Sequence, residues 1–196
     1  MVEKELNLHN KKLSKIDHLQ DDLASVVLSS NRLTSLPPVI GNLSVLKKLD
    51  ISHNLLSSLP EEFGKLKNLE VLCMVSNPFK QLPSCMSGLT NLKRLNLFNI
   101  KLTQVPSWIG DLKNLEFLNL NGNELTMLPK ELGKLTNLKE FHVGLNKLTD
   151  DSFPYELNYL VSLNHVSLFT NRITKAPNFV VNLKLKDEGV HYYRKR

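Results

Sequence analysis

Apolar residues recur along this chain in a repeated block, L-x-x-L-x-L-x-x-N-x-L. The blocks begin at Leu23, Leu46, Leu69, Leu92, Leu115, Leu138 and Leu163. Five of the six spacings between these leucines are 23 residues, and the last is 25. Each block starts with alternating apolar and polar residues, and this period of two predicts a short β-strand with one buried face.

A second pattern follows the block, x-x-L-P-x-x-I-G-x-L or a close variant, and it has no period of two. Proline lacks an N–H group and ends strand pairing, so the chain should turn away from the sheet there. We expect glycine to permit a tight backbone turn at the end of this segment in four copies, at Gly41, Gly64, Gly110 and Gly133. Neither half can bury its apolar side alone, so stability must come from stacking of the copies.

These copies resemble the leucine-rich-repeat family, and the resemblance extends from Leu6 to about Leu183. The 23-residue frame is similar to the intracellular branch that includes Ras-suppressor and Shoc-type scaffold proteins. The resemblance implies an α/β fold, a curved solenoid with a parallel β-sheet on its concave face and short helical or 3-10 segments and turns on its convex face. It also implies a protein-interaction module or scaffold in intracellular signal transduction, which catalyses no reaction itself.

The repeat frame predicts a single leucine-rich-repeat domain over residues 1–196. Three parts are expected: an N-terminal partial repeat and cap (1–22), seven repeats (23–183) and a C-terminal cap with a basic tail (184–196). We expect Val190, Tyr192 and Tyr193 to cover the last core layer. The two extra residues of the sixth repeat, within the sequence Leu148 to Pro154, predict an enlarged polar surface loop.

An asparagine occupies the ninth position of almost every block, in a column that is otherwise buried. Its amide can bond the backbone groups that lose their partners where each strand ends, so these asparagines are predicted to be structural. They are Asn31, Asn54, Asn77, Asn123, Asn146 and Asn171. The fourth repeat has Ile100 instead, and we expect that Ile100→Asn adds stability if a turn group there is otherwise unpaired.

Positions three, five, seven and eight of each block should face solvent on the concave side of the sheet, here called the inner face. From the third repeat onwards these positions carry apolar, aromatic and polar residues of the kind that interfaces favour. The candidates for partner binding are Val71, Val75, Arg94, Phe98, Phe117, Asn119, Asn121, His142, Leu145, His165 and Phe169. The alternative is that strands favour such residues anyway and that cross-strand stacking alone retains them.

Charge and composition narrow the function classes. The chain has a net charge of +6, but the charged residues expected on the inner face sum to −1, because Lys48 and Arg94 oppose Glu5, Asp50 and Glu140. Nucleic-acid binding needs basic residues clustered on one face. Because the inner face has no such cluster, we expect no binding of nucleic acid. With 41% hydrophobic residues, forty of them leucine, and only short apolar runs, we expect a globular chain without membrane insertion.

No motif that would place a nucleophile, a bound phosphate or a metal is present, so we expect no enzyme activity and no cofactor. His142 and His165, with Glu140 beside them, are a weak zinc candidate, and solvated or partner-contacting histidines fit better. Cys73 and Cys85 should be free thiols, and the charged N-terminus lacks a secretory signal, which predicts a cytoplasmic location.

The sequence therefore predicts a monomer that binds a protein partner through its concave face. Several alternatives stay open: a pathogen effector, a regulatory subunit of a phosphatase, GTPase or ubiquitin-ligase complex, or a purely structural or self-associating module. The identity of the partner does not follow from the sequence.

Overall fold

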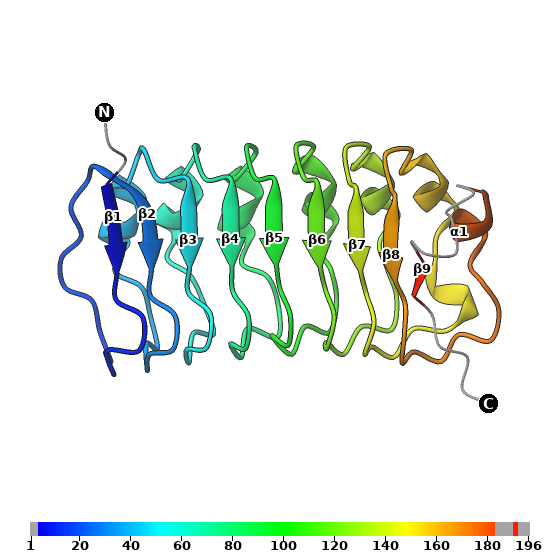
Figure 1. The fold of residues 1–196 in the computed structure, drawn as a ribbon, viewed down its shortest axis with the longest axis horizontal. Helices are drawn as coiled ribbons and strands as arrows, with labels where there is room; N and C mark the ends of the chain where they lie inside the picture. The colour runs from blue at the N-terminus through cyan, green and yellow to red at the C-terminus, as the bar shows by residue number, and fades with distance from the viewer. Residues whose placement is uncertain (1–3, 183–189, 192–196) are drawn as a thin grey trace.

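The repeats stack side by side, and each contributes one strand to a parallel sheet whose strand order follows the chain from β1 to β9 (Figure 1). The computed structural model describes residues 4–182 and 190–191. The strands are β1 (Lys4–Asn7), β2 (Leu23–Val27), β3 (Lys48–Asp50), β4 (Val71–Cys73), β5 (Arg94–Asn96), β6 (Phe117–Asn119), β7 (Glu140–His142), β8 (His165–Ser167) and β9 (Val190–His191).

The register pairs equivalent positions of neighbouring repeats, so residues at one block position form a column across the sheet. Position three of β4 pairs with position three of β5, as Val71 with Arg94, and Arg94 pairs in turn with Phe117. Residues that are 23 positions apart in the sequence thereby become neighbours about 4.8 Å apart.

The second half of each of the first six repeats forms one or two short 3-10 helices, and that of the seventh forms a short α-helix, on the face of the sheet that lies away from the viewer in Figure 1. A proline precedes each of the six helices that follow the common pattern, and its carbonyl accepts the first bond of the helix, as in Pro37 with the Ile40 N–H at 3.0 Å. The segments are η1 (Pro38–Asn42), η2 (Glu61–Lys65), η3 (Ser84–Gly88), η4 (Ser107–Asp111), η5 (Lys130–Lys134), η6 (Asp150–Ser152), η7 (Tyr155–Tyr159) and the α-helix α1 (Asn178–Asn182).

The core lies between the sheet and these helices. Block positions one, four and six point into it, and Leu46, Leu49 and Ile51 of the second repeat are all fully buried there. An apolar residue of each 3-10 helix except η6, such as Phe63 of η2, closes the core from the other side. The predicted fold class, a leucine-rich-repeat solenoid with a parallel sheet and convex 3-10 segments, is confirmed.

The asparagine column runs through this core and bonds only to backbone. The Asn123 side-chain oxygen accepts from the N–H groups of Ile100 and Leu102 at 3.1 and 3.0 Å, and its amide donates to the carbonyls of Leu97 and Leu120 at 2.9 Å each. Asn31, Asn54, Asn77, Asn146 and Asn171 make equivalent bonds. Each asparagine therefore joins its own repeat to the preceding one.

The column is interrupted at Ile100, which is fully buried. In the other repeats the N–H at block position eleven donates to the asparagine of the next repeat, as Leu56 does to Asn77 at 3.0 Å. Phe79 holds this position beside Ile100, and within residues 4–182 its N–H has no protein acceptor. The missing asparagine thus leaves a buried donor unpaired at the middle of the solenoid.

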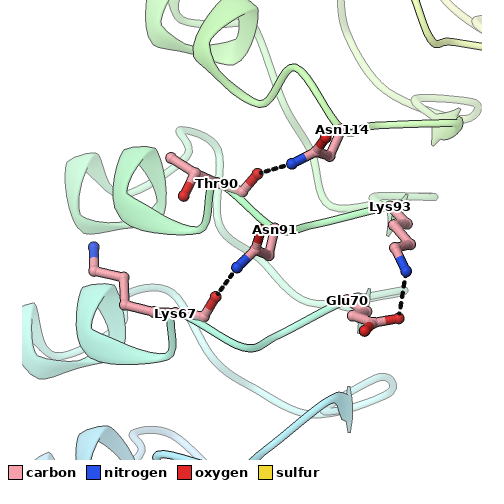
Figure 2. A network of polar contacts seen from close by, with 6 residues as sticks. All are labelled: Lys67, Glu70, Thr90, Asn91, Lys93 and Asn114. Atoms are coloured by element: carbon pink, nitrogen blue, oxygen red, sulfur yellow. Dashed lines mark hydrogen bonds and ion pairs between the residues drawn. The ribbon is translucent and has the colours of Figure 1, made fainter.

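A second set of asparagines, which the sequence pattern did not suggest, links the repeats at the opposite end of the strands. The amide of Asn91 donates to the carbonyl of Lys67 at 2.8 Å, and Asn114 donates to Thr90 at 2.9 Å (Figure 2). Asn68 and Asn137 make the same bond in their repeats. The signal was present in the sequence, because each of these residues directly precedes the first leucine of a block.

The expected role of the four convex glycines is wrong. Gly41, Gly64, Gly110 and Gly133 lie inside the 3-10 helices and none of them has a positive φ, so they do not form the predicted turn. They are needed because the next repeat lies so close: a Cβ on Gly133 would stand 2.2 Å from the carbonyl oxygen of Glu156. Glycine here permits close stacking of the convex helices.

The insertion in the sixth repeat is also more ordered than a surface loop. Its residues form η6, and Ser152 is 1% exposed. The Ser152 hydroxyl accepts from the Thr149 N–H at 2.8 Å and donates to the Thr126 carbonyl at 2.6 Å. The extra residues therefore extend the convex packing by one short helix.

The first and last strands of the sheet, β1 and β9, each pair with a single neighbouring strand, β2 and β8 respectively. Leu6, Leu8 and Leu13 of the predicted N-terminal cap are partly buried against the core. At the other end, β9 pairs in parallel with β8, while Tyr192 and Tyr193 of the predicted C-terminal cap lie outside the described residues. Within residues 4–182 and 190–191, no helix is long and apolar enough to cross a membrane.

Candidate functional site

Four of the predicted partner-binding residues form a continuous row across four neighbouring strands. Arg94 lies on β5, Phe117 on β6, His142 on β7 and His165 on β8. Each of the three consecutive pairs is in side-chain contact. We call these four residues the inner-face row.

Arg94 and Phe117 make the first contact of the row. The guanidinium carbon of Arg94 lies 4.1 Å from the centroid of the Phe117 ring, within the range of a cation–π interaction. Arg94 is exposed, whereas Phe117 is half-buried. The contact holds a mobile, charged side chain in one place above the sheet without removing it from solvent.

The histidines extend the row. The His142 ring is centred 5.3 Å from Phe117 and 5.0 Å from His165, tilted by 49° and 47°. Its Nε2 atom lies 3.5 Å from a carboxylate oxygen of Glu140. Burial lowers the pKa of His142, and the neighbouring His165 lowers it further, against the opposing effect of Glu140. His142 is therefore held mostly neutral near pH 7.

Three apolar candidates lie beside the row or near it. Val71 on β4 pairs with Arg94 and is half-buried, as is Val75 beyond the end of β4. Leu145 is 40% exposed and has a φ of 53°. Position eight has this left-handed backbone in every repeat, and the others fill it with Asn, Ser, His, Gly or Thr. A leucine there combines an unfavourable backbone with an exposed apolar side chain.

Phe98 and Phe169 are half-buried because glycines of neighbouring repeats leave room for their rings. A Cβ on Gly122 would lie 3.1 Å from the Phe98 ring, and one on Gly144 would lie 2.8 Å from the Phe169 ring. These two phenylalanines therefore contribute to packing between repeats as well as to the inner face. Gly122 and Gly144 were not recognised in the sequence as partners for aromatic side chains.

The side-chain oxygens of Asn119 and Asn121 both accept hydrogen bonds from backbone N–H groups of this chain. The side-chain oxygen of Asn119 accepts from the Asn121 N–H at 2.9 Å, and that of Asn121 accepts from the Gly144 N–H at 2.5 Å. Asp50 and Asn96 occupy the same column as Asn119 and make the same local bond to the N–H two residues later. Asn119 and Asn121 are both half-buried.

The expected exposure of position seven is wrong in the N-terminal repeats. Ser29 and Ser52 are each only 6% exposed, and at position five Ser167 is 4% exposed. Small side chains at the edge of the sheet are covered by their neighbours, while the larger residues at the same positions reach beyond them. The exposed part of the inner face is therefore concentrated on its larger side chains.

Several charged side chains outside the inner face form ion pairs between neighbouring repeats. Lys93 bonds Glu70 at 2.9 Å (Figure 2), and Lys139 bonds Glu116 at 2.8 Å. The hydrogen bond from Lys139 lowers the pKa of Glu116. Glu70, Lys93, Glu116 and Lys139 occupy position two of four consecutive blocks, so their charges alternate in sign every 23 residues. The sequence contains this pattern, but it was not used to predict ion pairs between repeats.

A separate depression of about 260 Å³ lies between η6 and the turn before α1, lined in part by Asp150, Phe153 and Phe179. Asp150 accepts from the N–H groups of Thr174 and Lys175 at 2.8 and 3.3 Å. Its hydrogen bonds with Thr174 lower the pKa of the carboxyl group. The carboxylate thus fixes the C-terminal turn. In the described part of the chain, no three or more His, Cys, Asp or Glu side chains gather to hold a metal ion.

The parallel one-strand-per-repeat sheet, the asparagine column and the convex 3-10 helices define a solenoid repeat protein. A family described as leucine-rich repeat region matches residues 2–104 and 86–186. The chain therefore belongs to the leucine-rich-repeat family. No curated protein gives a significant match.

Solved structures show the same architecture. A leucine-rich-repeat protein of Leptospira interrogans is 33% identical with a TM-score of 0.87, and the match covers 95% of this chain and 49% of that one. A TDR receptor is 30% identical with a TM-score of 0.79, covering 96% and 34%. An internalin C2 of Listeria monocytogenes is 26% identical with a TM-score of 0.79, covering 96% and 80%. The chain thus spans about half the length of the Leptospira protein.

Proposed function

We propose that this chain is a non-catalytic interaction module that binds a protein partner through its inner face, centred on Arg94, Phe117, His142 and His165. The observation that carries the proposal is the unbroken contact of these side chains across β5 to β8. Arginine and aromatic residues dominate the binding energy of many interfaces. Side chains already held by their neighbours also lose little conformational entropy when a partner binds.

Leu145 supports the same face. A non-glycine residue in the left-handed region costs of order 1–3 kcal/mol, and such residues gather at functional sites. Leu145 adds exposed apolar area to this cost, because 40% of its surface is open to solvent. A role in partner contact accounts for both features.

The scaffold role in signalling, the cytoplasmic location and the monomeric state expected from the sequence belong to this proposal. The two free thiols, Cys73 and Cys85, suit a reducing compartment. A regulatory subunit of an enzyme complex, or an effector, would use the same face, and the identity of the captured partner distinguishes these cases.

The test is affinity capture with matched surface variants of the full chain. Phe117→Ala with His165→Ala removes the centre and one end of the row, while Tyr155→Ala with Tyr159→Ala removes two exposed rings from the opposite side, on η7. We expect the tyrosine variant to capture the same protein as the wild type and the row variant to lose it. A row variant that melts like the wild type and keeps every partner contradicts the proposal.

Light scattering of the purified chain tests the monomeric state. A mass that rises with concentration, together with no captured partner, would instead support a self-associating module.

A further inference from the structure

The inner-face row has a specific electrostatic feature that points to its ligand. Arg94 is exposed and its guanidinium carbon lies over the Phe117 ring, so one side of the group is covered while its N–H donors stay accessible to solvent. Within the described residues, Arg94 forms no ion pair with a carboxylate. A planar guanidinium whose face is occupied and whose edge is unpaired is arranged to bind a carboxylate through two parallel hydrogen bonds.

The acidic residues of the inner face are too far away to fill this role. Glu140 is in the same column as Arg94 but two strands away, which is about 9–10 Å, and it lies beside His142. Asp50 is also two strands away, on the other side, and its side-chain oxygen accepts from the Ser52 N–H at 2.9 Å. Glu116, next to Phe117, is close enough for the charge of Arg94 to contribute to its lowered pKa, but its carboxylate bonds Lys139 at 2.8 Å. The hydrogen-bond donors of Arg94 are therefore available to a partner.

We propose that the inner-face row binds an extended segment of a protein partner that presents an Asp or Glu carboxylate to Arg94 and an adjacent apolar side chain to Phe117. This inference rests on the proposed function and names the chemistry of its partner. The row crosses three strand intervals, about 14 Å, which an extended segment covers with about four residues. Val71, beside Arg94, offers a second apolar contact at the same end.

The charge of the row favours a carboxylate over a phosphate group. Arg94 is the only permanent cation of the four residues, and Glu140 places a negative charge 3.5 Å from His142. A single negative charge balances Arg94, whereas a phosphate group with nearly two charges would be repelled by Glu140. The phosphorylated form of a bound segment should therefore bind more weakly.

Binding should also strengthen as the pH falls. The charged and titratable groups that face His142 are Arg94 on β5, Glu140 on its own strand β7 and His165 on β8, and β6 contributes the uncharged Phe117. In the free chain, burial and His165 disfavour the protonated form of His142. The partner carboxylate on Arg94 lies two strands from His142, so it favours that form through space and not by direct contact. Binding therefore takes up only a fraction of a proton, and affinity rises modestly from pH 7.5 towards pH 6 while the carboxylate stays ionised.

The test selects random 12-residue peptides displayed on phage against the full chain at pH 6 and sequences those that bind. Parallel selections use Arg94→Gln, Phe117→Ala and, as a charge control on the same face, Lys48→Gln on β3. We expect the wild type and Lys48→Gln to enrich peptides with Asp or Glu next to an apolar residue. Arg94→Gln should lose the acidic preference, and Phe117→Ala should enrich nothing.

The peptides selected distinguish failure of the carboxylate inference from failure of the inner-face proposal. Peptides that need Phe117 but carry no acidic residue would overturn the carboxylate inference and leave the inner-face proposal standing. Peptides that bind Phe117→Ala as well as the wild type, or no enrichment at all, would count against both.

The affinity of a synthetic copy of an enriched peptide is then measured for the wild type and the variants. Replacing its acidic residue with the amide should weaken binding about tenfold, the loss expected for a charged hydrogen bond. Arg94→Lys keeps the charge but not the planar fork, so it should recover only part of the affinity lost in Arg94→Gln. His142→Gln should flatten the pH dependence. Tighter binding of a phosphoserine peptide, or a pH profile unchanged by His142→Gln, would refute the corresponding step.

Discussion

Replacing Asn123 with alanine should destabilise the protein much more than the same change at Asn146, although both side chains are buried in the same column. The difference comes from Ile100. Because the repeat of Ile100 has no ladder asparagine, the carbonyl of Leu97 accepts from Asn123 alone within the described residues. The carbonyls that Asn146 bonds each have a second donor: another asparagine for Leu120 and Val143, and the Gly122 N–H for Gly144.

The groups left unpaired can be counted from these bonds. Without the Asn123 side chain, the N–H groups of Ile100 and Leu102 and the carbonyl of Leu97 lose their partners. Without Asn146, the N–H of Leu125 loses its partner. An unpaired buried group costs about 1–3 kcal/mol, so we expect a loss of at least about 3 kcal/mol for Asn123→Ala, with three such groups, and about 1–3 kcal/mol for Asn146→Ala, with one.

Urea denaturation measures both losses. Trp108 is the single tryptophan and is partly buried in the fourth repeat, so its fluorescence reports on the region around the Ile100 interruption. Far-UV circular dichroism followed in the same samples shows whether the whole solenoid unfolds with it, as a single free energy requires. The reasoning is refuted if the two variants lose the same stability, or if Asn146→Ala loses more. A double variant with Ile100→Asn should reduce the cost of Asn123→Ala, because the Leu97 carbonyl regains a donor.

Three further changes test the packing between repeats by the same denaturation measurement. Ile100→Asn should raise the free energy of unfolding by about 1 kcal/mol, because pairing the Phe79 N–H outweighs the lost apolar side chain; a clear loss would contradict this. Gly133→Ala should cost about 1–3 kcal/mol, since its Cβ would meet the Glu156 carbonyl at 2.2 Å, and a neutral result would mean that the helices separate freely. Ser152→Ala should cost about 1–2 kcal/mol through its two buried bonds, and wild-type stability would show them to be dispensable.

The period of 23 residues and the alternation within each block were enough to predict the short strands and the stacking of the copies, because equivalent positions of a repeat must stack to bury their leucines. The parallel order of the strands and the convex helical segments were expected from the resemblance to the leucine-rich-repeat family. The same period placed Arg94, Phe117, His142 and His165 on one face. Their role in partner binding stays a prediction. Alternation along a strand assigns a side chain to a face of the sheet but does not determine how far it tilts towards the next strand.

The direction in which each side chain tilts towards the next strand depends on the tertiary structure. The diagonal contacts of His142 with Phe117 and His165 depend on rotamers set by neighbouring repeats, and the burial of Ser29 and Ser52 depends on what surrounds them. The convex glycines were correctly seen as special, yet the reason lies in the distance to the next repeat, which no single repeat contains. The sequence by itself determined which residues share a column, because that follows from the period, whereas contacts between columns and repeats follow from packing distances and required the folded chain.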